Sequence, residues 1–246
     1  MKKFVVSVAL AMGAALTGWG QQNSAVGQAS KSSFEFGALL QGGNALTEGE
    51  GGIHFMMAGV HAGKVLTDDM GPGLLKGNFE YAMELFPFWQ SYTPKSQRQM
   101  CVPNANTSLY TCSAPYTIGG TFTGASLTPI ILRWNLTSGT RWMPWIQGAG
   151  GVLWTNHKYP AFGGPPIALP GTAVGSGSVG NNTPADDTSV WNFTPQFGVG
   201  AHYFLKPGRS VDFAANAVHI SSASLGDKNP GVNASVQFSV GYTWWK

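Results

Sequence analysis

Strict alternation of apolar and polar residues is the dominant pattern along this chain. In the last segment, every second residue from Ala234 to Trp244 is apolar, and polar or small residues stand between them. The segments from Trp191 to Leu205 and from Leu75 to Leu85 repeat the pattern. Successive side chains of a β-strand point to opposite faces, so a period of two predicts strands with one apolar and one polar face.

Eight strands follow from this pattern. Their expected ranges are 33–41, 53–65, 74–88, 124–136, 142–155, 190–205, 210–221 and 232–245. The connections alternate in length: short at 66–73, 137–141 and 206–209, and longer at 42–52, 89–123, 156–189 and 222–231. A soluble sandwich would alternate too. However, long strands with aromatic residues at their ends favour a membrane barrel, whose strands need about 9–11 residues to cross. We expect a single all-β domain, an eight-stranded antiparallel transmembrane β-barrel.

The N-terminus has the layout of a secretory signal peptide. Met1-Lys2-Lys3 precedes an apolar stretch from Phe4 to Leu16, and small and polar residues follow it. This stretch is too short for a membrane-spanning helix. We expect residues 1–20 to be the signal peptide, with cleavage after Gly20 or, as a second choice, after Ala25. The cleavage site stays open up to residue 29, and the barrel domain is expected at 30–246.

Composition narrows the function classes. Only 10% of the residues are charged, against roughly 25% in ordinary soluble proteins. The formal net charge of +3 gives no case for a nucleic-acid partner. The two cysteines, Cys101 and Cys112, lie in a polar segment without a nearby histidine. In an exported chain, this favours a disulfide that closes a short loop, and a metal site is the poorer interpretation.

His219 and Ser221 are the most informative pair for function. They stand two apart at the end of an apolar run, so both side chains share one strand face. An imidazole beside a hydroxyl is the minimum apparatus for nucleophilic acyl transfer, because it takes the proton that makes serine a weak nucleophile. Their set of alternating positions also holds Phe213, Ala215 and Ala217, which predicts that the pair faces lipid at the outer rim.

The segment that begins at His219 and ends at Asn233 resembles the lipid A 3-O-deacylase family of outer-membrane β-barrels, also called acyloxyacyl-hydrolase-like. The family pattern is H-x-S-N-A, then a loop with N-x-G, then an acidic residue and the final strand. Here His219 matches the general base and Ser221 the nucleophile, with Ala223, Asn229 and Gly231 also in place. The resemblance implies an outer-membrane serine esterase, with lipid A or lipopolysaccharide as its substrate and no cofactor or metal.

Two departures from the family pattern concern the site. Ser222 stands where the family usually has asparagine, and Asn233 where it usually has glutamate. An asparagine carbonyl still accepts the imidazole N–H but lacks the charge that stabilises imidazolium. Alternation puts Asn233 with the inward set of its strand, so a bulge between Gly231 and Ala234 would be needed to turn it outward. Asp227 is the candidate substitute acid.

The predicted site therefore has three parts. His219, Ser221 and Asn233 are the catalytic residues, while Asn229, Gly231 and Ser222 support the oxyanion or bind substrate. The other histidines, His54, His61, His157 and His202, show no convincing partner in the sequence, and no metal-ligand cluster is evident. The main alternative is a non-enzymatic barrel with a structural, adhesive or narrow-pore role. In that case, the absence of the family's acidic residue would reflect a loss of catalytic activity. An acyltransferase would need an acceptor site that the sequence does not reveal.

Overall fold

The computed structural model describes residues 25–46, 52–98, 101–103, 106, 110–112, 114–157, 189–222 and 233–246. Two short 3-10 helices, η2 (Ala25–Gln28) and η3 (Gly73–Leu75), accompany a structure made otherwise of strands. The long strands are β1 (Phe34–Ala45), β2 (His54–Val65), β3 (Gly77–Arg98), β6 (Tyr116–Leu136), β7 (Trp142–Thr155), β9 (Gln196–Lys206), β10 (Arg209–Ile220) and β11 (Asn233–Trp245). The short ones are β4 (Cys101–Pro103), β5 (Tyr110–Cys112) and β8 (Trp191–Phe193).

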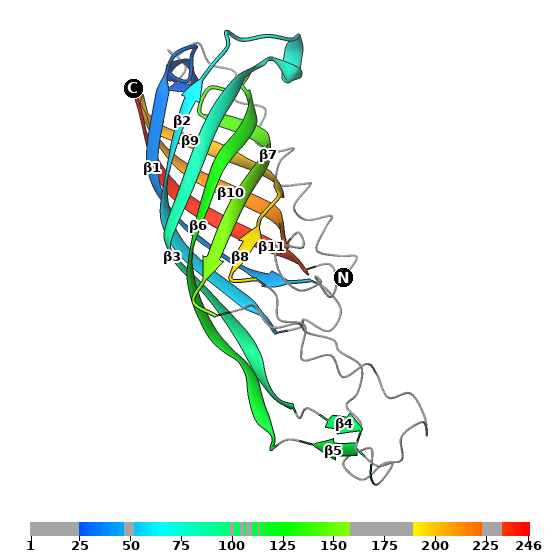
Figure 1. Cartoon of the computed structure of the whole chain (residues 1–246). Helices are drawn as coiled ribbons and strands as arrows, with labels where there is room; N and C mark the ends of the chain where they lie inside the picture. Colours follow the sequence, from blue (N-terminus) through cyan, green and yellow to red (C-terminus); the bar gives the residue numbers. More distant parts are fainter. Residues whose placement is uncertain are drawn as a thin grey trace, which may run out of the picture.

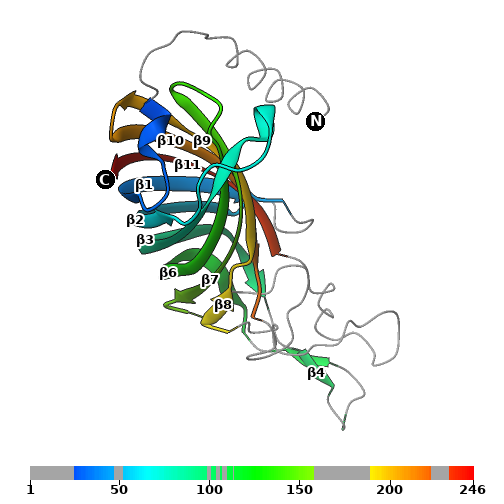
Figure 2. The same cartoon turned by 90° about the horizontal axis from the view of Figure 1, so that it is seen from above.

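The long strands form a closed antiparallel barrel (Figure 1). In the described part of the chain, eight of them pair in the order β6-β3-β2-β1-β11-β10-β9-β7, and β7 pairs with β6 to close the ring. The view from above shows β1, β11 and the other strands curving round a common interior (Figure 2). The predicted fold class is confirmed, and each of the eight long strands falls within or overlaps a predicted range; the range 190–205 is divided into β8 and β9. The barrel has a turn end, with short connections at 66–76, 137–141 and 207–208, and a loop end opposite.

The largest differences from the predicted boundaries are in β3 and β6, which continue well into the segment 89–123 that was expected to be a loop. They form a two-stranded arm that extends beyond the loop end (Figure 1). Outside the barrel wall no lipid-facing side is required, so the period of two weakens although pairing continues. The register shifts between Thr93 and Ser96, where Gly119 and Gly120 have φ of 86° and 107°, a region that glycine enters without steric cost.

The barrel reverses the usual distribution of polarity. Large apolar side chains cover its outside, among them Phe36, Leu40, Ile130, Phe197 and Phe238, each at least half exposed. The buried set includes charged and amide residues that point into the lumen: Glu35, Glu80, Glu84, Arg133, Asn135, Gln147, His202, Asp212 and Asn216. An apolar exterior over a polar interior suits a wall that is surrounded by lipid.

Arg133 is the centre of the lumen. Its Nη1 donates hydrogen bonds to Glu35 Oε1 at 2.9 Å and Glu80 Oε1 at 3.1 Å, and its Nε donates to Gln147 Oε1 at 3.1 Å. The guanidinium also lies over the Trp145 ring, 4.6 Å from its centroid. These bonds join β6 to β1, β3 and β7, so one side chain ties four strands of the wall together.

Apolar clusters fill the lumen on both sides of this network. The cluster toward the loop end consists of Leu39, Ile53, Phe55, Met57, Phe86, Trp89, Phe122, Leu153 and Ile220. The cluster at the turn end consists of Val26, Ala29, Val65, Met143, Phe204 and Trp245. Val26 and Ala29 come from the segment around η2, so this segment packs as part of the barrel. The expected signal peptide, residues 1–20, lies outside the described residues.

Cys101 and Cys112 lie directly opposite each other in the small sheet β4–β5. None of the described cysteines is free. A directly opposite position on antiparallel strands brings two Cα atoms to about 4.5–5.5 Å, within the range that a disulfide needs. The register therefore supports the predicted disulfide.

Removing the central cation should destabilise the barrel strongly. Arg133→Met leaves Glu35 and Glu80 buried without a compensating charge, so we expect the free energy of unfolding to fall by about 3–5 kcal/mol. Urea unfolding in lipid vesicles, followed by tryptophan fluorescence, measures this. Lys95→Met on the exposed arm is the control and should change little. Adding Glu35→Gln and Glu80→Gln to Arg133→Met should restore part of the loss. An unchanged Arg133→Met protein would refute the central role.

The disulfide can be tested by alkylation and intact-mass measurement. Without reductant, the exported protein should take up no iodoacetamide, and after reduction it should take up two equivalents because the chain holds two cysteines. Cys101→Ser should make Cys112 reactive without reductant. Alkylation of both cysteines in the unreduced parent protein would contradict the pairing.

Candidate active site

His219 and Ser221 lie at the loop end of β10, on its outer side. Val218 and Ile220 are buried, whereas Phe213 and Ala217 are exposed, so odd-numbered positions of this strand face outward. His219 and Ser221 continue the odd-numbered set and are half-buried. The expected outward orientation at the rim thus agrees with the burial pattern.

A short strand that the sequence did not separate holds the backbone of the pair. Ser221 N donates to Phe193 O at 2.9 Å, and Phe193 N donates to Ser221 O at 2.6 Å. His219 N donates to Pro195 O at 3.0 Å. β8 follows the same direction as β9, and the two are separated by Thr194-Pro195. The backbone of β10 pairs first with β9 and then, at its last residues, with β8. The two candidate catalytic residues therefore stand on paired backbone.

The outer surface around the pair is apolar. Ala234 lies opposite His219 on β11, and Phe193 lies opposite Ser221 on β8. One step along the strands, Ala217 is flanked by Phe197 and Val236. Phe193 and Phe197 are 40% and 58% exposed. A long acyl chain would find small and aromatic side chains beside the hydroxyl, with no described charged group among these cross-strand neighbours.

The expected third member of the site, Asn233, follows the regular backbone register of β11. Asn233 pairs with Ile220, an inward-facing residue, and Ala234 pairs with His219. The β10–β11 pairing is regular through these residues, so the bulge expected to turn Asn233 outward is absent from the described register. Asp227, Asn229 and Gly231 lie outside the described residues.

Ser222 is on the other side of the wall from Ser221. It is fully buried, and its Oγ has no hydrogen-bond partner within the described residues. A side chain enclosed in this way has no direct route to a substrate on the lipid-facing surface. We therefore leave Ser222, which the sequence suggested as a substrate-binding residue, out of the proposed site.

Three of the four histidines without an evident partner in the sequence have one in the structure. His202 Nδ1 lies 2.6 Å from Asp212 Oδ1, and His61 Nε2 lies 2.8 Å from Thr243 Oγ1, both in the lumen. His54 Nδ1 lies 2.5 Å from Asn44 Oδ1 at the loop end. The short turn at Pro207-Gly208 alone would set residue 202 opposite residue 213. The register shift between Arg209 and Ser210 moves His202 opposite Asp212, and the sequence gives no signal for this shift.

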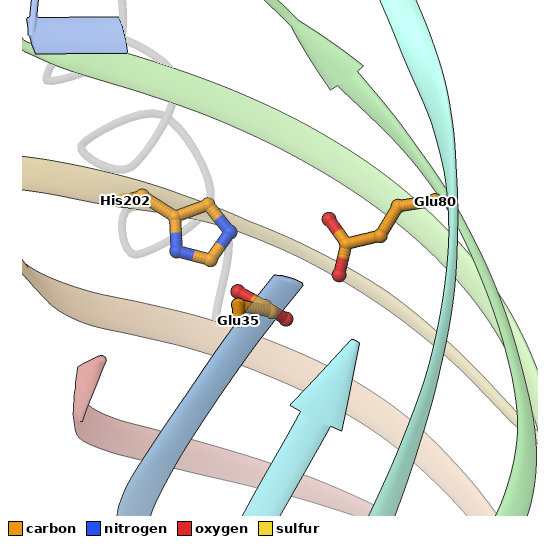
Figure 3. Close-up of side chains that lie close together, drawn as sticks. All are labelled: Glu35, Glu80 and His202. Atoms are coloured by element: carbon orange, nitrogen blue, oxygen red, sulfur yellow. The ribbon is translucent and has the colours of Figure 1, made fainter. Parts of the chain in front are cut away.

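The lumen also holds a group with the composition of a metal site: Glu35, Glu80 and His202 (Figure 3). Their ligand atoms lie within 4.8 Å of one another. However, Arg133 Nη1 lies 2.9 Å, 3.1 Å and 3.4 Å from Glu35 Oε1, Glu80 Oε1 and His202 Nε2. The guanidinium thus already supplies the positive charge that a metal ion would bring, and we assign no metal to this group.

A closed antiparallel barrel with an apolar exterior, a filled polar lumen and long connections at one end only defines an outer-membrane β-barrel protein. Among the described residues, no helix has the length and apolar character to cross a membrane. The family model for lipid A 3-O-deacylase (PagL) matches residues 78–243, more than half of the chain. The chain belongs to this family of outer-membrane hydrolases.

Solved structures of other barrels are similar to this chain at low identity. The outer membrane enzyme PagL is 14% identical, with a TM-score of 0.38, covering 86% of this chain and 98% of its own. The N-terminal β-barrel domain of Pseudomonas aeruginosa OprF is 10% identical, with a TM-score of 0.40 and coverage of 87% and 99%. OprG from Pseudomonas aeruginosa is 8% identical, with a TM-score of 0.39 and coverage of 88% and 97%. No curated protein matches the chain significantly.

Proposed function

We propose that this chain hydrolyses an ester-linked acyl chain of lipid A, with Ser221 as the nucleophile and His219 as the general base. One observation carries the proposal. The two residues that match the family's base and nucleophile share the lipid-facing side of the barrel at its loop end. Lipid A occupies the outer leaflet of the outer membrane, and the long loops of such barrels are extracellular.

The reaction follows from the two side chains. Ser221 Oγ attacks the ester carbonyl while His219 takes its proton, and the sugar hydroxyl leaves with that proton when the C–O bond breaks. Water then attacks the acyl-serine, His219 again accepts a proton, and the fatty acid is released as Ser221 recovers its hydrogen. Asn229 and Gly231 are proposed to donate hydrogen bonds to the oxyanion. The chemistry uses no cofactor.

The residue that orients His219 has two candidates. Asn233 matches the position of the family's acid, and its backbone pairs with Ile220 in the regular register of β10 and β11. Asp227 has the charge and belongs to the connection that joins β10 to β11. A carboxylate would fix the imidazole tautomer and stabilise the imidazolium, whereas an amide would do only the first.

The second candidate function is a barrel that has lost catalysis. The absence of a carboxylate at residue 233 favours it, because the family position for the acid is filled by an amide. A wide pore is disfavoured, since Arg133 and the two apolar clusters fill the lumen. The remaining version of this alternative is a structural or adhesive protein.

Replacing the nucleophile should abolish the activity. With Ser221→Ala we expect fatty-acid release from purified lipid A in detergent to fall below about a thousandth of the parent rate, because no other group forms the acyl intermediate. Ser138→Ala is the matched control, since Ser138 is exposed in a turn at the opposite end. Mass spectrometry of lipid A from cells with each variant checks the result in the membrane. A parent protein that releases no fatty acid would establish the non-enzymatic alternative.

Three further variants separate the two candidates for the orienting residue. If Asn233 orients His219, Asn233→Ala should slow release about 10–100-fold, and Asn233→Glu should keep or raise the rate because it restores the charge. If Asp227 does so, Asp227→Ala should be the slow variant and Asn233→Ala should match the parent.

A further inference from the structure

The turn end of the barrel carries basic residues for which the described part of the chain provides no ion pair. Arg141 precedes β7, Lys206 ends β9, and Arg209 begins β10. These strands are neighbours in the wall. Lys206 and Arg209 pair across their turn, and Phe204 N donates to Arg141 O at 2.8 Å. Arg141, Lys206 and Arg209 thus form a basic arc along the rim.

The acidic residues of the described part lie elsewhere. Two are at the turn end, and each is already paired: Asp68 with Lys31 at 3.0 Å and Asp69 with Lys76 at 3.2 Å. The other four are buried in the lumen: Glu35, Glu80, Glu84 and Asp212. No described Asp or Glu side chain therefore pairs with the basic arc, while Lys31 and Lys76 at the same end are paired.

Aromatic side chains lie next to the basic arc on the outer face. Trp142 packs on Tyr203 with ring centroids 4.8 Å apart, directly beside Arg141. Arg209 Cζ lies 6.0 Å from the centroid of the Trp244 ring. Aromatic rings of this kind mark the interface between hydrocarbon and headgroups, so the basic arc stands at the depth of lipid phosphates. The short turns face the periplasm in outer-membrane barrels.

We propose that the basic arc binds the phosphate headgroup of an anionic phospholipid, phosphatidylglycerol in chemical class, in the periplasmic leaflet. Adjacent strands are about 4.8 Å apart, so the three cations span about 10 Å, and their long side chains can converge on one phosphate. Guanidinium groups bind phosphate oxygens in a bidentate manner. A zwitterionic lipid has a positive charge in its own headgroup, so its electrostatic attraction to the basic arc is weaker. This site is independent of the deacylase site, which lies at the other end.

Tryptophan quenching in bilayers tests the proposal. The folded full chain is placed in phosphatidylcholine vesicles that contain either bromine-labelled phosphatidylglycerol or bromine-labelled phosphatidylcholine. Bromine close to Trp142 and Trp244 quenches their fluorescence, so relative quenching reports relative occupancy of the rim. We expect about a fivefold preference for phosphatidylglycerol, the effect that about one basic residue near an anionic lipid supplies, and we expect it to weaken with added salt.

The variants keep Arg209 in place, because it donates to Gly208 O at 2.7 Å and helps hold the turn. Arg141→Gln with Lys206→Gln should reduce the preference to within twofold. Lys31→Gln with Lys76→Gln is the control. It removes the same amount of positive charge from the same end, but from two lysines that are already in ion pairs, so the preference should stay intact. Equal quenching by both lipids in the parent, or equal losses in the two double variants, would overturn the proposal.

Discussion

Closure of the sheet is the constraint on which the rest of this structure depends. Within hydrocarbon, every backbone N–H and C=O must find a partner inside the protein, so a spanning sheet cannot keep a free edge. The pairing of β7 with β6 meets this requirement by joining the last two edges of the wall. Once the sheet is closed, each residue faces either lipid or lumen, and the alternation along the chain assigns which.

The lumen then has to be filled with groups that satisfy one another. Arg133 answers this requirement by binding Glu35 and Glu80 across the interior, and the His202–Asp212 pair extends the network. Breaking such a buried pair costs far more than its net contribution to stability, because the remaining charge has no solvent. The network fills the lumen, whereas the candidate catalytic residues lie on the outer side of the barrel wall.

The candidate site depends on the wall in a second way. A strand end normally frays, but β8 pairs with the end of β10 and holds the backbone of Ser221. Ser221 therefore stands at the end of the paired strand, next to the segment that contains Asp227 and Asn229. At the opposite rim the basic arc faces the other leaflet. In the two proposals, the two ends act on chemically different lipids, and the lumen network holds both ends in one body.

The sequence by itself determined the all-β class, the eight strands and the outward face of His219 and Ser221, because each rests on a period of two that a membrane wall enforces locally. It did not determine the arm formed by β3 and β6, since outside the lipid no apolar face is needed and the period weakens. It also missed the separate strand β8 and the Arg133 network. Those contacts join residues far apart in the chain, and only closure of the barrel brings them together.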